Sequence, residues 1–191
     1  MTIPNVDVKK ATELVAQAQS VIDTGVKRLS ALGGPDKEQI AAHKEILTGA
    51  GSLKNERDLN AAITAGAQFA VSAGFSPAIA KEATKLNIPY FPGVATPTEI
   101  LAALEAGITT LKFFPAETLG GISALKAMAA PFPGIRFMPT GGINLANMND
   151  YLSFAPVVAI GGSWMVPQKL VDAGDFAEVE RLTHEALKAV K

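Results

Sequence analysis

The sequence predicts an α/β fold made of repeated βα units and closed into a (β/α)8 barrel of the TIM type. Short apolar runs alternate along the chain with Ala-rich helical stretches, which is typical of parallel strands joined by helices. Gly25, Gly66 and Gly107 each stand between a helical stretch and the next apolar run, and they fall 41 residues apart. With two βα units in each interval, the chain holds roughly eight units, the number that closes such a barrel.

The strands are expected at the apolar runs, and the helices are expected in the intervals between them. The helix that follows the fifth strand has the clearest start, because Thr96–Glu99 supplies an N-cap, a proline in the first turn and a capping-box partner. Pro77 after Ser76 marks a similar start, and an amphipathic helix from Asp175 onward is expected to cover the barrel. In chain order, the predicted strands are Ile3–Val8, Val26–Leu32, Ile46–Gly49, Gln68–Ser72, Ile88–Phe91, Thr109–Phe113, Ile135–Pro139 and Val157–Gly161.

Length and composition fit one soluble domain, residues 1–191. The chain is 48% hydrophobic and 18% charged, which is enough apolar material for one well-filled core. A net charge of −1 gives no overall attraction to nucleic acid or to an anionic membrane. With no cysteine and two histidines, the chain offers no thiolate nucleophile and little to a metal. Without a secretory pattern or an apolar run near the ~20 residues of a membrane span, we expect a cytoplasmic protein with small-molecule ligands.

Lys112 interrupts an apolar strand. In a barrel, the run Thr109–Phe113 should be buried on both faces, where an ammonium group is costly unless it is paired or its pKa falls. Lys112 also stands near the carboxyl end of its strand, where the active sites of such barrels lie. A desolvated amine attacks carbonyl groups, and the iminium that forms acts as an electron sink. Lys112 is therefore the candidate nucleophile; the alternative is a lysine that extends its amine into water at the strand end.

Two glycine pairs follow the last two predicted strands, Gly141 with Gly142 and Gly161 with Gly162. Glycine lets an anion approach the backbone amides closely, and the loops after strands seven and eight form the recurrent phosphate site of this fold. Ser163 adds a hydroxyl beside the second pair. The alternative is that each pair only forms a tight turn between a strand and a helix. Two pairs at equivalent positions favour the phosphate site.

Other residues near these motifs carry less chemistry. Glu117 follows the lysine strand without a visible partner, so a capping or surface role is expected. Trp164 is expected to pack beneath a short helix rather than to stack on a ligand. His43 and His184 lie within helical stretches and are expected at the surface.

Several segments of the chain together resemble a known enzyme family. The run Lys-Phe-Phe-Pro-Ala-Glu at residues 112–117 is the most specific of them. From about residue 46 to the end, roughly three quarters of the chain, the order and spacing of the segments match the 2-keto-3-deoxy-6-phosphogluconate (KDPG) and 4-hydroxy-2-oxoglutarate (KHG) aldolases. The matching segments are Thr48–Asn55, Gly93–Glu99, Leu111–Gly121, Arg136–Asn144 and Ile160–Pro167.

The resemblance implies a class I aldolase, a lyase in which Lys112 forms a Schiff base with a keto acid. It further implies a (β/α)8 barrel, no cofactor and no metal, a keto acid and a phosphorylated aldehyde as small-molecule partners, a homotrimer, and a place in Entner–Doudoroff degradation. Ser52 falls where a threonine of the family contacts the pyruvate carboxylate, and Phe114 forms a wall of the pocket. The residues that the resemblance assigns to the substrate phosphate are Thr140, Gly141, Gly142, Gly161, Gly162 and Ser163.

The first 45 residues depart from the family pattern, so the first two strands are expected to be altered. By alignment, Ser30 replaces the glutamate that shuttles protons, and Gly34 replaces the arginine that pairs with the substrate carboxylate. Loss of a positioned acid-base group slows a reaction by about 100- to 10,000-fold. Asp7, near the top of the first expected strand, is the candidate for a substitute acid-base group.

Two other functions stay open. The chain is a scaffold derived from this family that binds phosphate ligands with weak or no turnover, or it is another phosphate-binding barrel enzyme such as a sugar-phosphate isomerase. The lysine within the strand argues against the isomerase.

Overall fold

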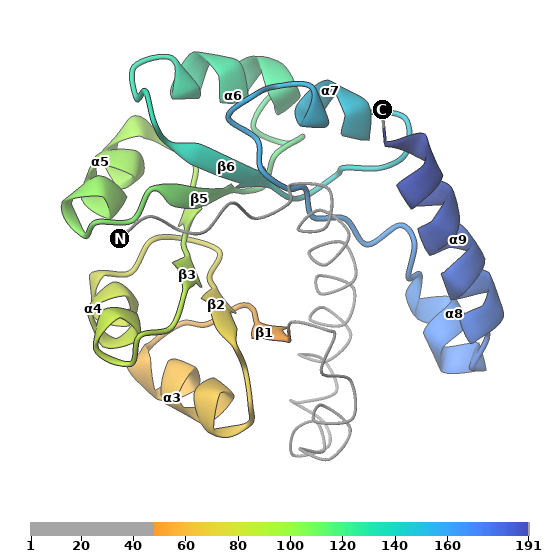
Figure 1. The fold of residues 1–191 in the computed structure, drawn as a ribbon, viewed down its shortest axis with the longest axis horizontal. Coiled ribbons are helices and arrows are strands. Elements are labelled where there is room, and N and C mark those ends of the chain that lie inside the picture. The colour runs from red at the N-terminus through yellow and green to blue at the C-terminus, as the bar shows by residue number, and fades with distance from the viewer. Residues whose placement is uncertain (1–47, 191) are drawn as a thin grey trace.

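Short parallel strands alternate with helices through residues 48–190, the part of the chain that a computed structural model describes (Figure 1). In one three-stranded sheet, β1 (Gly49–Ala50) pairs with β2 (Phe69–Val71), and β2 pairs with β3 (Tyr90–Phe91). In the other, β4 (Gly93–Val94) pairs with β5 (Thr110–Phe113), and β5 pairs with β6 (Arg136–Pro139). Every pairing is parallel, as the sequence predicts for βα units.

The two sheets continue into each other at Pro92, which alone separates β3 from β4. Proline has no N–H group to donate to a neighbouring strand, but its carbonyl accepts a 2.8 Å hydrogen bond from the Lys112 amide. Beyond β6, Val157 bridges to Phe137 and Gly161 bridges to Thr140, both in parallel. The described strands therefore form one continuous parallel row.

Most of the predicted strands that fall within the described residues are confirmed, with shifted ends. The third is seen at Gly49–Ala50, while the first two residues of its predicted range, 46 and 47, lie outside the described residues, and the fifth extends past Pro92 to Val94. Of the eighth, Val157–Gly161, the described residues show two isolated parallel bridges, at Val157 and at Gly161. The first and second, Ile3–Val8 and Val26–Leu32, lie outside the described residues.

The predicted helix starts are confirmed by their caps. The Thr96 hydroxyl accepts from the Glu99 amide at 3.3 Å, and the Glu99 carboxylate accepts from the Ala95 amide at 2.7 Å. Ser76 caps its helix in the same way, through the Ile79 amide. The helices are α3 (Glu56–Thr64), α4 (Pro77–Lys85), α5 (Pro97–Glu105), α6 (Gly121–Ala129), α7 (Met148–Leu152), α8 (Gln168–Ala173) and α9 (Phe176–Ala189).

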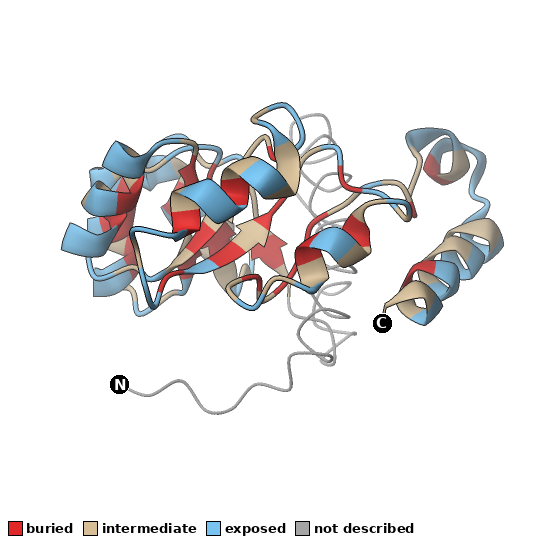
Figure 2. Cartoon of the chain, turned by 90° about the horizontal axis from the view of Figure 1, so that it is seen from above, coloured by how far each residue is buried: buried red, intermediate tan, exposed pale blue. Residues whose placement is uncertain are grey.

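Alternate side chains of β5 point to opposite faces of the row. Leu111 and Phe113 are fully buried against a cluster that includes Ile100 of α5 and Leu125 of α6. Each such side chain contributes about 1.5–3 kcal/mol relative to leaving it in water. By the two-residue period of a strand, Lys112 points to the other face, away from these helices. Figure 2 shows the buried strands enclosed by helices whose outer surfaces are exposed.

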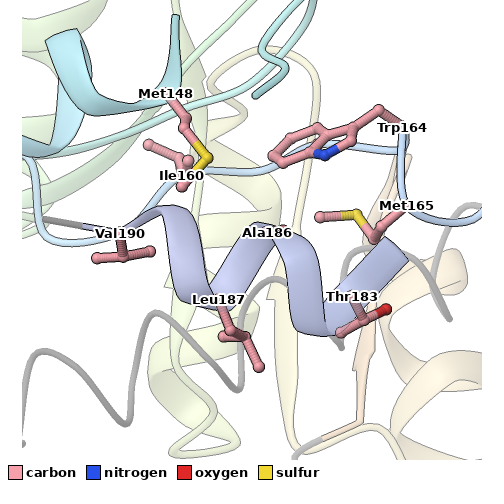
Figure 3. Close-up of a pocket in the computed structure, with 9 residues that line it drawn as sticks. Met148, Ile160, Trp164, Met165, Thr183, Ala186, Leu187 and Val190 are labelled. Atoms are coloured by element: carbon pink, nitrogen blue, oxygen red, sulfur yellow. The ribbon is translucent and has the colours of Figure 1, made fainter. Parts of the chain in front are cut away.

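The last two helices lie to one side of the strand row (Figures 1 and 2). The end of α9 reaches α7, where the side-chain nitrogen Nδ2 of Asn149 donates to the Ala189 carbonyl at 2.8 Å. Figure 3 shows a small apolar pocket between α9 and the segments that carry Met148, Ile160 and Trp164. Among the described residues, α9 therefore covers the fold through its second half, from Thr183 onward. None of the helices described between residues 48 and 190 is long and apolar enough to cross a bilayer.

Candidate active site

Lys112 lies on the face of β5 that points away from the helices, which we call the inner face, between Gly93 on β4 and Met138 on β6. The Ala73 backbone lies directly against Gly93, since a Cβ atom there would lie 2.0 Å from the Ala73 carbonyl oxygen, so only glycine fits at this position. The Lys112 side chain is half-buried, and its Nζ lies 4.3 Å from the centroid of the Phe114 ring. An ammonium group over an aromatic face is attracted by the ring by about 0.5–2 kcal/mol. The structure therefore brings Lys112 and Phe114 together.

The first glycine pair forms a tight turn whose shape excludes larger residues. Gly141 and Gly142 have φ values of +100° and +82°, a region that L side chains rarely adopt. A Cβ atom on Gly141 would lie 3.2 Å from the Pro115 Cα atom, and one on Gly142 would lie 2.6 Å from the Glu117 Cβ atom. The turn after β6 is thus packed directly onto the turn after β5.

Three consecutive carbonyl groups of this turn accept hydrogen bonds from the protein. The Thr140 carbonyl accepts from the Ala116 amide at 2.8 Å, and the Gly141 carbonyl accepts from the Glu117 amide at 3.0 Å. The Gly142 carbonyl accepts from the side-chain amides of two asparagines, each at 3.2 Å. In contrast, the amide N–H groups of Gly142 and Ile143 donate no hydrogen bond within residues 48–190. A left-handed turn with unused amides is a backbone arrangement that binds anions.

The second glycine pair lies beside the first. The Gly161 amide donates to the Pro139 carbonyl at 2.9 Å, and Gly161 bridges to Thr140. Gly162 is covered by the indole of Trp164, since a Cβ atom on Gly162 would lie 1.7 Å from the ring. The amides of Gly162 and the exposed Ser163 donate no hydrogen bond to any described residue. Trp164 therefore packs against Gly162 and lies beside α9, a helix of 14 residues.

Thr140 joins the two loops and carries a buried hydroxyl. The residue is 7% exposed, and its Oγ1 atom has no hydrogen-bond partner among the described residues. A buried polar atom without a partner costs about 1–3 kcal/mol. Thr140 follows Met138 by two residues and so shares its inner face, which places the hydroxyl on the same side as Lys112. Such an unused group is suited to contact a ligand.

Ser52 lies at the carboxyl end of β1, on the same edge as the other predicted residues. It is exposed and has a φ of +58°, which is uncommon for a residue with a side chain. Two strand positions separate β1 from β5 in the pairing order, and no described contact joins Ser52 to Lys112. Asp7, Ser30 and Gly34 lie outside the described residues.

Glu117 is exposed, which agrees with the expected surface role, but it does have a partner. The Tyr151 hydroxyl of α7 donates a short hydrogen bond to its Oε1 atom. Tyr151 is 1% exposed, and burial, together with the Glu117 carboxylate, raises its pKa above the ordinary tyrosine value. The two residues are 34 positions apart, so no local pattern could have predicted the contact. The only signal for Glu117 in the sequence is its position at the end of the run 112–117.

Comparison with known proteins gives a consistent family match. The family model described as "Aldolase: KDPG and KHG aldolase" matches residues 1–182. The KHG/KDPG aldolase of Escherichia coli K12 is 39% identical over 195 aligned positions, covering 99% of this chain and 92% of that protein. The 2-dehydro-3-deoxy-phosphogluconate aldolase of Treponema pallidum is 40% identical over 194 positions, covering 98% and 92%.

Solved structures agree with the sequence match. The KDPG aldolase of Legionella pneumophila, with pyruvate captured as a covalent carbinolamine intermediate, is 30% identical with a TM-score of 0.77, covering 97% of this chain and 90% of that one. The 2-keto-3-deoxy-6-phosphogluconate aldolase of Zymomonas mobilis ZM4, with 3-phosphoglycerate, is 32% identical with a TM-score of 0.74, covering 97% and 99%. These similarities extend over the segment that the sequence marked as divergent.

Proposed function

The chain belongs to the KDPG and KHG aldolase family and is an aldehyde-lyase, and on that premise we propose that Lys112 is its Schiff-base nucleophile. The observation that carries the proposal is the placement of Lys112 on the inner face at the strand ends, half-buried over Phe114 and beside two glycine turns. The covalent pyruvate intermediate of the Legionella relative supports it. The substrate is KDPG or KHG, and one product is pyruvate.

The chemistry follows from the amine. The neutral Lys112 amine attacks the keto carbon to give a carbinolamine, which loses water to form an iminium. As the hydroxyl at C4 loses its proton, the C3–C4 bond breaks, and its electron pair passes to the iminium nitrogen as an enamine. The aldehyde leaves, the enamine takes up a proton at C3, and water releases pyruvate and the free lysine. We assign the proton transfers to a group among residues 1–47, with Asp7 as the candidate.

The two glycine turns are proposed as the site for the substrate phosphate. Gly141, Gly142 and Gly162 supply backbone amides, Gly161 adds no side chain to the second turn, and Thr140 and Ser163 supply hydroxyl groups. The unused amides of Gly142, Ile143, Gly162 and Ser163 and the unpartnered Thr140 hydroxyl support this assignment. The 3-phosphoglycerate in the Zymomonas relative is a ligand of the same chemistry.

The remaining assignments complete the proposal. Ser52 contacts the pyruvate carboxylate, and Phe114 forms a wall of the pocket. The whole chain, 1–191, folds as one domain in which the parallel row closes into a (β/α)8 barrel, and the protein assembles as a homotrimer. It acts in the cytoplasm, in the Entner–Doudoroff degradation of sugar acids.

Reductive trapping tests the nucleophile. Incubation with pyruvate and borohydride should add the mass of one reduced pyruvate to the parent protein and to Lys126→Ala, but not to Lys112→Ala. Lys126 is a matched control, since its Nζ also lies near an aromatic ring, 5.8 Å from the centroid of Phe154. An unmodified parent protein would exclude Schiff-base chemistry. A trapped adduct without pyruvate release from KDPG, measured with coupled lactate dehydrogenase, would identify the inactive scaffold instead.

A further inference from the structure

Glu117 stands where the turn after β5, the turn after β6 and two helices meet. Its amide donates to the Gly141 carbonyl, and its carbonyl accepts from the Gly120 amide at 3.2 Å, just before α6. Its carboxylate reaches Tyr151 on α7. Glu117 is thus in contact with the first glycine turn, with the residues just before α6 and with α7.

The aliphatic part of Glu117 forms the floor of this turn. A Cβ atom on Gly142 would lie 2.6 Å from the Glu117 Cβ atom and 2.7 Å from its Cγ atom, so the glycine rests directly on the side chain. With the carbonyl groups of Thr140 and Gly141 also held by the backbone of residues 116 and 117, the turn has little freedom to rotate. Its unused amides are therefore held in one direction.

The carboxylate of Glu117 is anchored away from Gly142. The Tyr151 hydroxyl donates to Oε1, and its raised pKa keeps that hydroxyl protonated and able to donate. Gly121, with a φ of +64°, makes room for the pair, since a Cβ atom there would lie 3.1 Å from Oε1 and 3.5 Å from the Tyr151 hydroxyl. The carboxylate also faces the start of α6, where the partial positive charge of a helix favours an anion.

We propose that Glu117 and Tyr151 are positioning residues that hold the Thr140–Gly142 turn in its anion-binding shape and so set the affinity for the phosphate of the substrate. The inference rests on the proposed function, because it assigns the same turn to phosphate. It predicts that the pair acts on phosphate affinity and leaves Schiff-base formation at Lys112 unchanged. Neither residue touches the reacting atoms.

The test compares a phosphorylated ligand with one that lacks phosphate. Calorimetry with 3-phosphoglycerate should give a Kd about tenfold higher for Glu117→Ala and Tyr151→Phe than for the parent. Each variant removes the hydrogen bond from the Tyr151 hydroxyl to the charged Glu117 carboxylate, and about tenfold in Kd is the free-energy scale of one such bond. Glu117→Gln keeps an acceptor oxygen and the side-chain shape, and should restore most of the affinity. With substrates, KM for KDPG should rise in the first two variants, while KM for KHG and the rate of pyruvate trapping stay within about twofold of the parent.

Tyr90→Phe is the matched control. Tyr90 of β3 is also a buried tyrosine, 6% exposed, and its hydroxyl lies 2.6 Å from the hydroxyl of Ser72, which directly follows β2. It should lower thermal stability to a similar degree without changing the affinity for 3-phosphoglycerate. Equal loss in Tyr90→Phe and Tyr151→Phe, or no loss in Glu117→Ala, would overturn the inference. Failure of the parent protein to bind 3-phosphoglycerate would also overturn it. Failure to trap pyruvate would overturn only the assignment of Lys112 as the nucleophile.

Discussion

Replacing Gly142 by alanine tests whether the first glycine turn is fixed by packing as well as by backbone conformation. The φ of +82° costs a residue with a Cβ atom about 1–2 kcal/mol. The new Cβ atom would also lie 2.6 Å from Glu117 Cβ and 2.7 Å from Cγ, and such overpacking costs about 1–3 kcal/mol more. We expect Gly142→Ala to lower the free energy of unfolding by about 2–5 kcal/mol, measured by urea denaturation.

Gly134→Ala separates the two costs. Gly134 has a φ of +92°, and a Cβ atom there would meet nothing within 4 Å. This variant should therefore show only the conformational cost of about 1–2 kcal/mol, and the effect of alanine on the unfolded chain is the same at both sites. It should keep the parent affinity for 3-phosphoglycerate, which Gly142→Ala should lose. Equal destabilisation by the two variants would refute the packing of Glu117 against Gly142.

Two further predictions concern groups around the same turn. Thr140→Val removes a buried hydroxyl without a partner while keeping its shape, so the free energy of unfolding should rise by about 1 kcal/mol while affinity for 3-phosphoglycerate falls; a destabilised variant would show that the hydroxyl is satisfied. Burial, and the Glu117 carboxylate, raise the pKa of Tyr151 above 10.0, and burial also raises that of Tyr90. Above about pH 10 the unfolded chain releases these protons first, so stability present below that pH is lost as pH rises. Urea denaturation across pH 9 to about 12 should show a shallower decline in Tyr151→Phe than in the parent, and an unchanged slope would contradict the raised pKa.

The βα alternation and the helix starts were predictable because they depend on local chemistry. Thr96, Pro97 and Glu99 interact within one turn of helix, so their spacing alone indicates where α5 begins. Lys112 was predictable for a similar reason, since a charged residue in an apolar strand stands out in any sequence. The family resemblance gave the chemistry, and the comparisons confirm that resemblance along the chain.

Strand ends and partner exchange depended on the tertiary structure. Pro92 lies within an apolar run, and nothing in that run indicates that the strand changes partner there from β2 to β5. The Pro92 carbonyl accepts a hydrogen bond from the Lys112 amide of β5, and this contact exists only in the assembled sheet. The extent of the eighth strand was also set by the assembled sheet, since among the described residues its pairing is limited to the bridges at Val157 and Gly161.

The sequence by itself determined the parallel α/β architecture, the lysine that interrupts its strand and the two glycine pairs at the strand ends. Each of these follows from residue type and short-range spacing. Only the tertiary structure decided that Glu117 and Tyr151, 34 residues apart, meet beneath Gly142. Such a contact depends on how α7 packs against the strand ends, and packing between distant segments leaves no periodic signal in one sequence.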